Sequence, residues 1–161
     1  PRNKNLGARI IINLEKLYLS LKKLGLKDDK IENYHIKSHQ LGIVSKNLNK
    51  LQNKIFGIEC NFEELNGIDF KKGCYVGQEN TARIKLKNKL TKRLLPIKII
   101  DGELSEDEKI YNNKVEIGKV LINEEYPFAL IKFLDKNFDK EQIFKSENGK
   151  FKIIVPEWLK I

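Results

Sequence analysis

The chain has 161 residues, of which 40% are hydrophobic and 33% charged, so it can bury a core and belongs to neither the fibrous nor the disordered class. Its 31 basic and 22 acidic residues give a net charge of +9, which attracts polyanions in general and selects none of them. The longest apolar runs fall far short of the ~20 residues that a membrane span needs, and no signal-peptide pattern begins the chain. We therefore expect a cytoplasmic protein with no membrane partner.

The first part of the chain predicts one short strand and a pair of helices. Residues 8–13 are apolar and indicate the strand, and residues 14–24 carry leucines at helical spacing up to Gly25. The two aspartates at 28–29 supply an N-cap and a negative first turn for a second helix, which we expect to end at Gly42. By itself this helix pair indicates no chemistry.

Two histidines, His35 and His39, lie four residues apart on the second predicted helix. That spacing can place two imidazoles on one metal ion, but no cysteine, glutamate or third histidine is arranged locally to complete such a site. We therefore predict a solvated helix face here and no metal site.

The character of the chain changes near residue 90. Residues 44–55 are polar and indicate a surface connection, and short apolar pieces follow up to Phe70. Strands separated by turn signals are then expected at residues 93–100, 115–122, 128–134 and 151–155. Short strands at this spacing favour a small antiparallel barrel or sandwich. The sequence thus predicts an α+β fold, with a helix-rich segment at residues 1–90 and a β domain at residues 91–161.

The segment KGCYVGQENTAR, which begins at Lys72, carries the strongest chemical signal. Glycines flank the Cys74–Tyr75 pair, and glycine permits tight turns and close backbone approach to a ligand. A helix that starts near Gly77 would place free N–H groups and a positive dipole end beside the thiol, which favours the thiolate, and Lys72 would assist. A thiolate there can bind metal, accept a cluster or act as a nucleophile, whereas a buried cysteine is commonly inert. We expect Cys60 to be such a packing residue.

Three polar residues of the same segment, Gln78, Glu79 and Arg83, follow at spacings that a helical turn brings together. Six basic residues lie from Arg83 to Arg93 with no acid among them. This run indicates either a solvated face or a surface that steers an acidic partner or an anionic ligand. It lacks the interleaved aromatic residues of a nucleic-acid stacking platform, so we do not expect direct nucleic-acid binding.

The motif resembles the K-G-C-[FY]-x-G-Q-E signature of the YgfZ family, which is related to the glycine-cleavage T-protein. The matching positions are Lys72, Gly73, Cys74, Tyr75, Gly77, Gln78 and Glu79. Segments on both sides are also similar to the family: Pro1-Arg2, Leu6-Gly7, Arg9, Asn66-Gly67-Ile68 and Pro156-Glu157-Trp158. The chain departs from the family pattern at Ser38, where many members carry arginine, and at Val44, where proline is usual. The resemblance covers essentially the whole chain but only the second part of the family's fold.

The resemblance implies the C-terminal part of a T-protein-like (GcvT/YgfZ-like) fold. Residues 1–90 would then be a remnant of the folate-binding body that carries the motif, and residues 91–161 the C-terminal β-barrel. The implied function is that of a folate-binding accessory protein for the assembly or repair of iron–sulfur proteins, including tRNA-modifying ones. The implied cofactor is tetrahydrofolate or another folate, and the implied partners are iron–sulfur assembly proteins or client enzymes. Because the first part of the fold supplies much of the folate cavity, we expect the chain alone to bind folate weakly.

By the same resemblance Cys74 is the residue that carries the chemistry. The residues implied to contact the cofactor or shape its site are Tyr34, Lys72, Gly73, Tyr75, Gly77, Gln78, Glu79 and Arg83. Tyr34 is equally well explained as a core aromatic of an amphipathic helix. One rival function is a tetrahydrofolate-dependent aminomethyltransferase, although T-proteins resemble this region without the cysteine. A second rival, a basic nucleic-acid-binding module, requires binding with a steep salt dependence. We expect an accessory protein rather than an enzyme of ordinary turnover.

Overall fold

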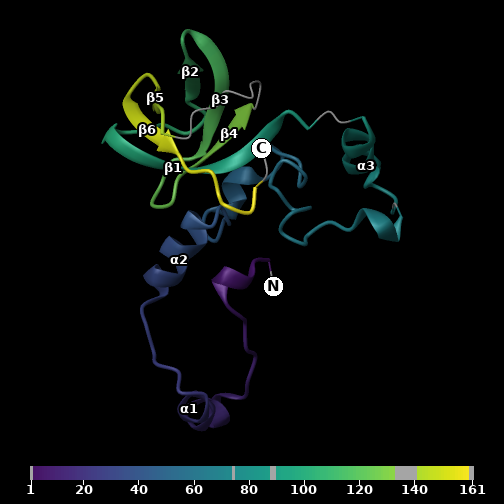
Figure 1. Cartoon of the computed structure of the whole chain (residues 1–161), viewed down its shortest axis with the longest axis vertical. Coiled ribbons are helices and arrows are strands. Elements are labelled where there is room, and N and C mark those ends of the chain that lie inside the picture. Colours follow the sequence, from purple (N-terminus) through teal and green to yellow (C-terminus); the bar gives the residue numbers. More distant parts are fainter. Residues whose placement is uncertain (1, 74, 88–89, 133–140, 160–161) are drawn as a thin grey trace.

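The computed structural model describes residues 2–73, 75–87, 90–132 and 141–159 (Figure 1). The α-helices in these residues are α1 (Leu14–Lys23), α2 (Ile31–Gln40) and α3 (Glu79–Leu86). The strands are β1 (Lys92–Gly102), β2 (Lys109–Asn112), β3 (Val115–Ile122), β4 (Phe128–Lys132), β5 (Ile143–Lys145) and β6 (Gly149–Ile153). Short 3₁₀ helices lie at Lys4–Leu6, Leu48–Leu51 and Phe70–Lys72. None of the described helices is long and apolar enough to cross a membrane.

The six strands form a closed antiparallel barrel in the order β1-β4-β3-β2-β5-β6. Closure depends on the length of β1, because its first half pairs with β4 and its second half with β6. The register of the second half shifts between Ile99 and Asp101, and such an irregularity increases the local twist that a closed sheet needs. The expected α+β fold with a small antiparallel barrel is therefore confirmed, and the arrangement is a barrel rather than a sandwich.

The interior of the barrel holds the main hydrophobic core. Its buried members are Leu95, Ile97, Leu104, Ile110, Val120, Ala129, Ile131, Phe144, Phe151, Ile153 and Leu159. One carboxylate is buried with them: Glu108 accepts hydrogen bonds from the backbone N–H of Ser105 at 2.6 Å and of Asn148 at 3.0 Å. These two bonds tie the β1–β2 connection to the β5–β6 turn, so the end of the barrel is held by a satisfied polar group.

A second hydrophobic cluster lies where the chain between α2 and α3 packs on the barrel. Its buried members are Leu51, Leu94, Leu121, Ile122, Phe128 and Leu130, with Val44, Ile55 and Cys60 packed against them. Residues 44–55 were expected to be a surface connection only, and this expectation is wrong because the segment contributes a buried leucine to a core. The backbone N–H of Leu94 also donates to the carbonyl of Glu59 at 2.8 Å. The cluster therefore draws on residues from both sides of position 90.

Four strands were predicted in the right places, and two were missed. β1, β3, β4 and β6 correspond to the predicted strands, although residues 133–134 of one prediction lie outside the described residues. β2 and β5 have only four and three residues, too few to show a hydrophobic alternation. One of the expected turns lies between β2 and β3, where Asn113 and Lys114 adopt positive φ angles of 46° and 68°.

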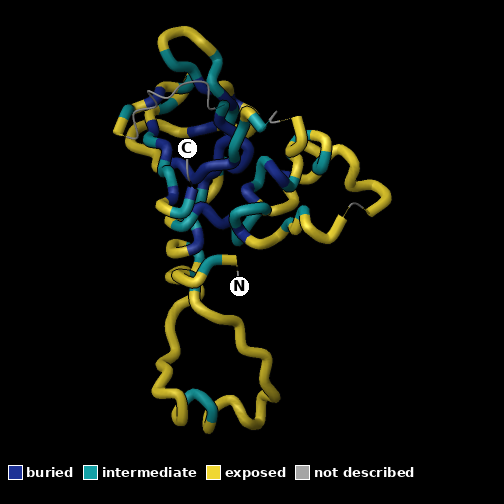
Figure 2. The backbone as a smooth tube through the Cα atoms, turned by 45° about the vertical axis from the view of Figure 1, so that its right-hand side comes forward, coloured by how far each residue is buried: buried dark blue, intermediate teal, exposed yellow. Residues whose placement is uncertain are grey.

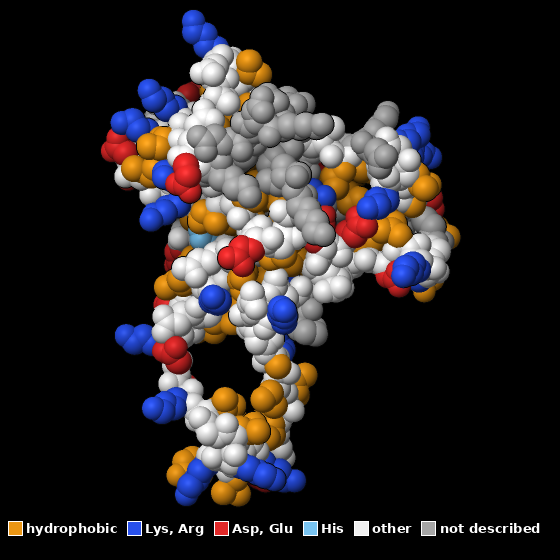
Figure 3. All heavy atoms as spheres, viewed as in Figure 1, with side chains coloured by type: hydrophobic (Ala, Val, Ile, Leu, Met, Phe, Trp, Pro, Cys, Tyr) orange, Lys and Arg blue, Asp and Glu red, His pale blue; other side chains and the backbone are white. Residues whose placement is uncertain are grey.

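The predicted helices α1 and α2 are confirmed, but the predicted aspartate N-cap of α2 is wrong, because Lys30 is the N-cap residue and no side chain caps the helix. The predicted strand at residues 8–13 is also wrong. This segment is extended and exposed, with Ile11 94% exposed, and no described strand lies beside it to form a ladder. Together with α1 it forms an arm that leaves the body of the molecule and returns to it at α2 (Figure 2). Hydrophobic side chains gather on this arm (Figure 3).

Candidate functional site

The motif forms a turn between a 3₁₀ helix and α3. The 3₁₀ helix Phe70–Lys72 is capped by Asp69, whose carboxylate accepts a hydrogen bond from the N–H of Lys71 at 2.8 Å. Gly73 and Gly77 both have a φ of +88°, a conformation that side chains other than glycine rarely adopt. Open space surrounds both positions, so the backbone conformation rather than close packing explains the two glycines.

One side-chain hydrogen bond links the two ends of this turn, and a second stabilises its α3 end. The ammonium of Lys72 donates to Oε1 of Gln78 at 3.0 Å and lies 3.9 Å from the centroid of the Tyr75 ring. The N–H of Gly77 donates to Oε1 of Glu79 at 3.1 Å. The Lys72–Gln78 bond thus links the described residues on either side of Cys74, and these residues lie on the molecular surface; we call this the tied turn. Cys74 itself lies outside the described residues, so its accessibility and thiol acidity remain predictions.

The helix after the turn begins at Glu79, two residues later than expected. Gln78 is its N-cap residue but makes no side-chain cap hydrogen bond, because its amide oxygen is already bound to Lys72. Backbone N–H groups, first that of Glu79 and then that of Gly77, lower the pKa of the Glu79 carboxyl, and the positive charge of Arg83 contributes last. An ionised carboxylate therefore occupies the first turn of α3, where the helix dipole favours it.

A pocket of about 260 Å³ lies beside the tied turn, and we call it the motif pocket. Its lining residues are Gly57, Phe62, Gly67, Ile68, Asp69, Phe70, Lys72, Gly73, Gln78, Thr81 and Ala82. Three residues predicted from the motif, Lys72, Gly73 and Gln78, therefore meet at one cavity. Tyr75, Gly77, Glu79 and Arg83 do not line it and are exposed, and their predicted role in cofactor binding is untested.

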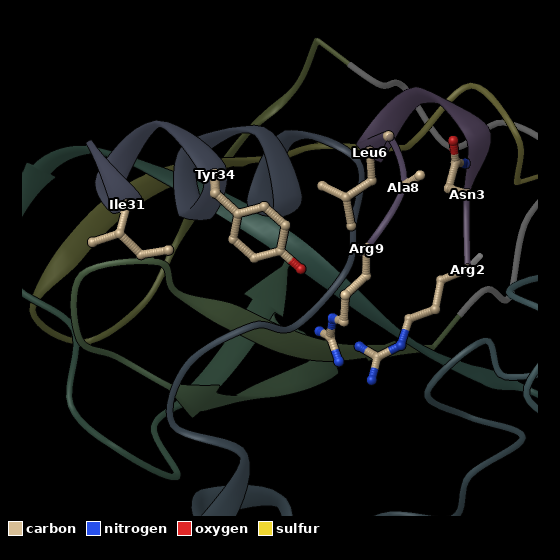
Figure 4. Close-up of a pocket in the computed structure, with 8 residues that line it drawn as sticks. Arg2, Asn3, Leu6, Ala8, Arg9, Ile31 and Tyr34 are labelled. Carbon is tan, nitrogen blue, oxygen red and sulfur yellow. The ribbon is translucent and has the colours of Figure 1, made fainter. Parts of the chain in front are cut away.

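Tyr34 lies in a different pocket, of about 540 Å³, which we call the arginine pocket. Its lining residues are Arg2, Asn3, Leu6, Gly7, Ala8, Arg9, Ile31 and Tyr34. Figure 4 shows the Arg2 and Arg9 guanidinium groups next to each other, with the Tyr34 hydroxyl directed toward them. The structure thus does not bring Tyr34 together with the motif in either pocket. Sequence reasoning missed the two arginines as pocket residues, although the family-like segment at residues 1–9 contained the signal.

No family model matches the chain, but several curated proteins do. The chain is 32% identical over 130 residues to a mitochondrial iron–sulfur cluster assembly factor IBA57 homolog of Neurospora crassa, which covers 73% of the chain and 29% of that protein. A Dictyostelium discoideum protein of the same name is 33% identical over 98 residues, which covers 60% of the chain and 24% of that protein. The tRNA-modifying protein YgfZ of Buchnera aphidicola is 42% identical over 94 residues, 54% of the chain and 28% of that protein. The chain belongs to the YgfZ family. It corresponds to the C-terminal part of the family's fold, and it spans less than a third of the length of these relatives.

Both histidines were expected to lie on a solvated helix face. In this YgfZ-family chain they pack against the barrel instead. His39 Nε2 lies 2.9 Å from the carbonyl oxygen of Pro127, and its ring meets the Phe128 ring edge-on at 5.2 Å. His35 Nδ1 lies 2.8 Å from Ser45 Oγ. The expectation of a solvated face is therefore wrong, because imidazole is amphipathic enough to cover an apolar joint while it keeps one polar partner. The described residues contain no group of three or more potential metal ligands.

The basic run that follows the family motif is partly neutralised. Lys85 forms an ion pair with Glu63 at 2.7 Å, and Arg93 forms one with Glu64 at 2.6 Å. Arg93 also donates a hydrogen bond to the Asn61 side chain at 3.3 Å. Two of the cations thus hold α3 and β1 to the segment before the motif, so the run is not a uniform surface for a polyanion.

Cys60 is half-buried against the second hydrophobic cluster, as expected of a packing residue. Burial, and to a lesser degree the negative charge of Glu59, raise the pKa of its thiol to about 12. Only the thiolate is nucleophilic, so in a Cys74→Ala variant the remaining thiol should react with iodoacetamide at pH 8 about 10³-fold more slowly than a free cysteine of ordinary pKa. A rate within tenfold of free cysteine would show that Cys60 is accessible. Mass spectrometry of the native chain measures the rate.

Proposed function

We propose that this chain carries the chemical site of an accessory protein for iron–sulfur protein maturation, with Cys74 as the residue that handles iron or sulfur. The names of its relatives, cluster assembly factor and tRNA-modifying protein, support this class of function. The observation that supports the proposal is the Lys72–Gln78 hydrogen bond, because a surface turn whose two ends are linked suits a residue that must meet a partner protein.

The chemistry follows from what a thiolate can do. It can ligate iron or exchange with sulfur on a partner, and its activity rises with the fraction of thiolate at neutral pH. Lys72 supplies a positive charge two residues before Cys74, while its bond to Gln78 holds the backbone of the turn. In this proposal the cluster or its iron is cargo, and the partners are assembly proteins or client enzymes, among them tRNA-modifying ones. The decisive test is rescue of iron–sulfur enzyme activity by site variants.

Folate is the second part of the proposal, and the arginine pocket fits it. Tyr34 is 38% exposed, so its ring can stack on a flat heterocycle, and the pocket also has apolar walls at Leu6 and Ile31. The guanidinium groups of Arg2 and Arg9 match the carboxylates of a folate tail in charge and geometry. When bound, a reduced folate supplies a one-carbon carrier. The residues of this chain would orient it through stacking and two charge-assisted contacts.

Arg9→Gln in the full-length protein is expected to weaken binding of folinic acid, a stable reduced folate, about 10- to 100-fold, because a hydrogen bond between charged groups contributes about 1.5–3 kcal/mol. Calorimetry at fixed salt measures the affinity. Lys4→Gln is the matched control, since Lys4 is an exposed cation of the same segment that does not line the arginine pocket. If Arg83→Gln weakens binding and Arg9→Gln does not, the folate site lies at the motif, as the sequence alone implied.

A further inference from the structure

Both histidines of the whole chain lie at one joint between α2 and the barrel. The joint is formed by the β3–β4 turn, which contributes Tyr126 and Pro127, and by the first residue of β4. The Tyr126 ring centroid lies 5.7 Å from that of His35 and 5.9 Å from that of His39. One tyrosine therefore contacts two imidazoles that are one helical turn apart, and in Figure 1 α2 lies directly below the barrel.

The surroundings of His39 favour an uncharged imidazole. The charged groups around Tyr126 are Lys46 and Glu125, which pair with each other at 2.6 Å, and Glu32, whose charge acts on Lys46. The remaining groups that face the histidines are a carbonyl, a hydroxyl and aromatic rings. In the described part of the chain neither imidazole forms an ion pair with a carboxylate, and Glu125 is already paired with Lys46.

We propose that His39 forms a latch that seats α2, and with it Tyr34, on the barrel only while its imidazole is uncharged, with His35 as a packing neighbour in the same joint. The link to Tyr34 is direct, because this residue lies in the same helix and its ring meets that of His35 edge-on at a centroid distance of 5.6 Å. The latch therefore makes the position of Tyr34, which lines the arginine pocket, depend on pH. The effect on folate rests on the proposed function, whereas the latch itself does not.

The direction of the pH effect follows from the burial of His39. Burial lowers the pKa of this imidazole, and the hydrogen bond to Pro127 offsets the effect only in part. The docked helix therefore binds a proton less readily than the undocked one, whose histidine titrates near ~6.5. The latch is fully present above that pH. Below it, the ratio of docked to undocked helix falls by up to about tenfold per pH unit until the pKa of the docked state is passed.

The chain contains its own reporter of α2 docking. Trp158 is the single tryptophan, and its indole N–H donates to the carbonyl of Leu41, the C-cap residue of α2, at 2.8 Å. Pro156 packs closely on Gly42, the next residue, so the end of α2 and the C-terminal segment form one contact. Release of α2 should expose the indole to water and shift its emission to longer wavelength.

The test is a fluorescence titration of the 161-residue chain from pH 8 to pH 5. We expect a reversible shift of the Trp158 emission to longer wavelength with a midpoint below 6.5, while far-UV circular dichroism shows the barrel intact. His39→Gln, whose amide can still donate to Pro127, should abolish the shift, and so should the double variant with His35→Gln, which contains no histidine. Persistence of the shift in the double variant, or its absence in the unsubstituted chain, contradicts the latch.

Proton NMR of the histidine rings provides a second measurement that needs no substitution. His39 should titrate below 6.5, and a midpoint at or above that value contradicts the latch. In the full-length protein, affinity for folinic acid should fall between pH 7.5 and pH 5.5 in the unsubstituted form and not in the double variant. If the Trp158 shift occurs and this fall does not, the latch stands and the assignment of folate to the arginine pocket is wrong.

Discussion

Replacement of Cys74 by alanine in the full-length protein should abolish rescue of iron–sulfur enzyme activity in cells that lack the protein. A thiolate is the group that can ligate iron or exchange sulfur, and alanine offers no substitute. The free energy of unfolding should change by less than about 0.5 kcal/mol, because the flanking residues Gly73 and Tyr75 are exposed and surface substitutions rarely do more. The measurements are the activity of an iron–sulfur enzyme in cell extract and urea unfolding of the purified variant.

Cys60→Ala is the matched control for this experiment. It removes the other thiol of the chain, which is half-buried and whose pKa of about 12 keeps it protonated. Rescue should be retained, with a loss of stability of about 1 kcal/mol from the second cluster. Normal iron–sulfur enzyme activity with Cys74→Ala, together with turnover of the glycine-cleavage intermediate by the protein, would replace the proposal with the aminomethyltransferase function.

The helices and the longer strands could be predicted because local patterns specify them. Leucines at helical spacing predicted α1, and apolar stretches bounded by turn residues predicted β1 and β3. The failures share a cause, which is dependence on a distant partner. The apolar residues 8–13 resemble a strand but have no neighbour to pair with, while β2 and β5 are short and exist only because barrel closure aligns them with their neighbours.

The candidate site, too, has features that the sequence predicts and features that it does not. The motif and its glycines could be recognised from the sequence, and their positive φ angles agree with the expectation of a tight turn. The hydrogen bond between Lys72 and Gln78 could not be predicted from the sequence, because it depends on how the turn folds back over six residues. The arginine pocket joins residues 2–9 to Ile31 and Tyr34 across the whole exposed arm, so no local pattern indicates it.

The histidines show why a spacing alone misleads. A separation of four residues places His35 and His39 on one face of α2, but only the fold determines what that face meets. It meets the β3–β4 turn, whose residues lie about ninety positions later in the chain. The same contact makes Phe128 a link between α2 and the second hydrophobic cluster, since its ring touches His39 and packs with Leu94 and Leu121.

Phe128→Ala should therefore be the most destabilising single side-chain truncation at this joint, with an expected loss of about 3–5 kcal/mol in the free energy of unfolding. Phe128 is 1% exposed, so its removal leaves a cavity in the second cluster and also withdraws the ring that His39 meets edge-on. Urea unfolding of the 161-residue chain, followed by circular dichroism, measures the change. A loss of this size is a large fraction of the roughly 5–15 kcal/mol that holds a small domain together.

Phe56→Ala is the control of the same residue type, because Phe56 is 50% exposed and belongs to neither hydrophobic cluster. It should lose less than about 1 kcal/mol. The comparison also tests whether the cluster joins the two halves of the chain. If Phe128→Ala unfolds in one transition at lower urea, the segment before α3 and the barrel unfold together. In the other outcome, the Trp158 signal shifts to lower urea and the barrel transition keeps its urea midpoint. The segment before α3 then unfolds separately from the barrel, and the second cluster is not a core shared by the two.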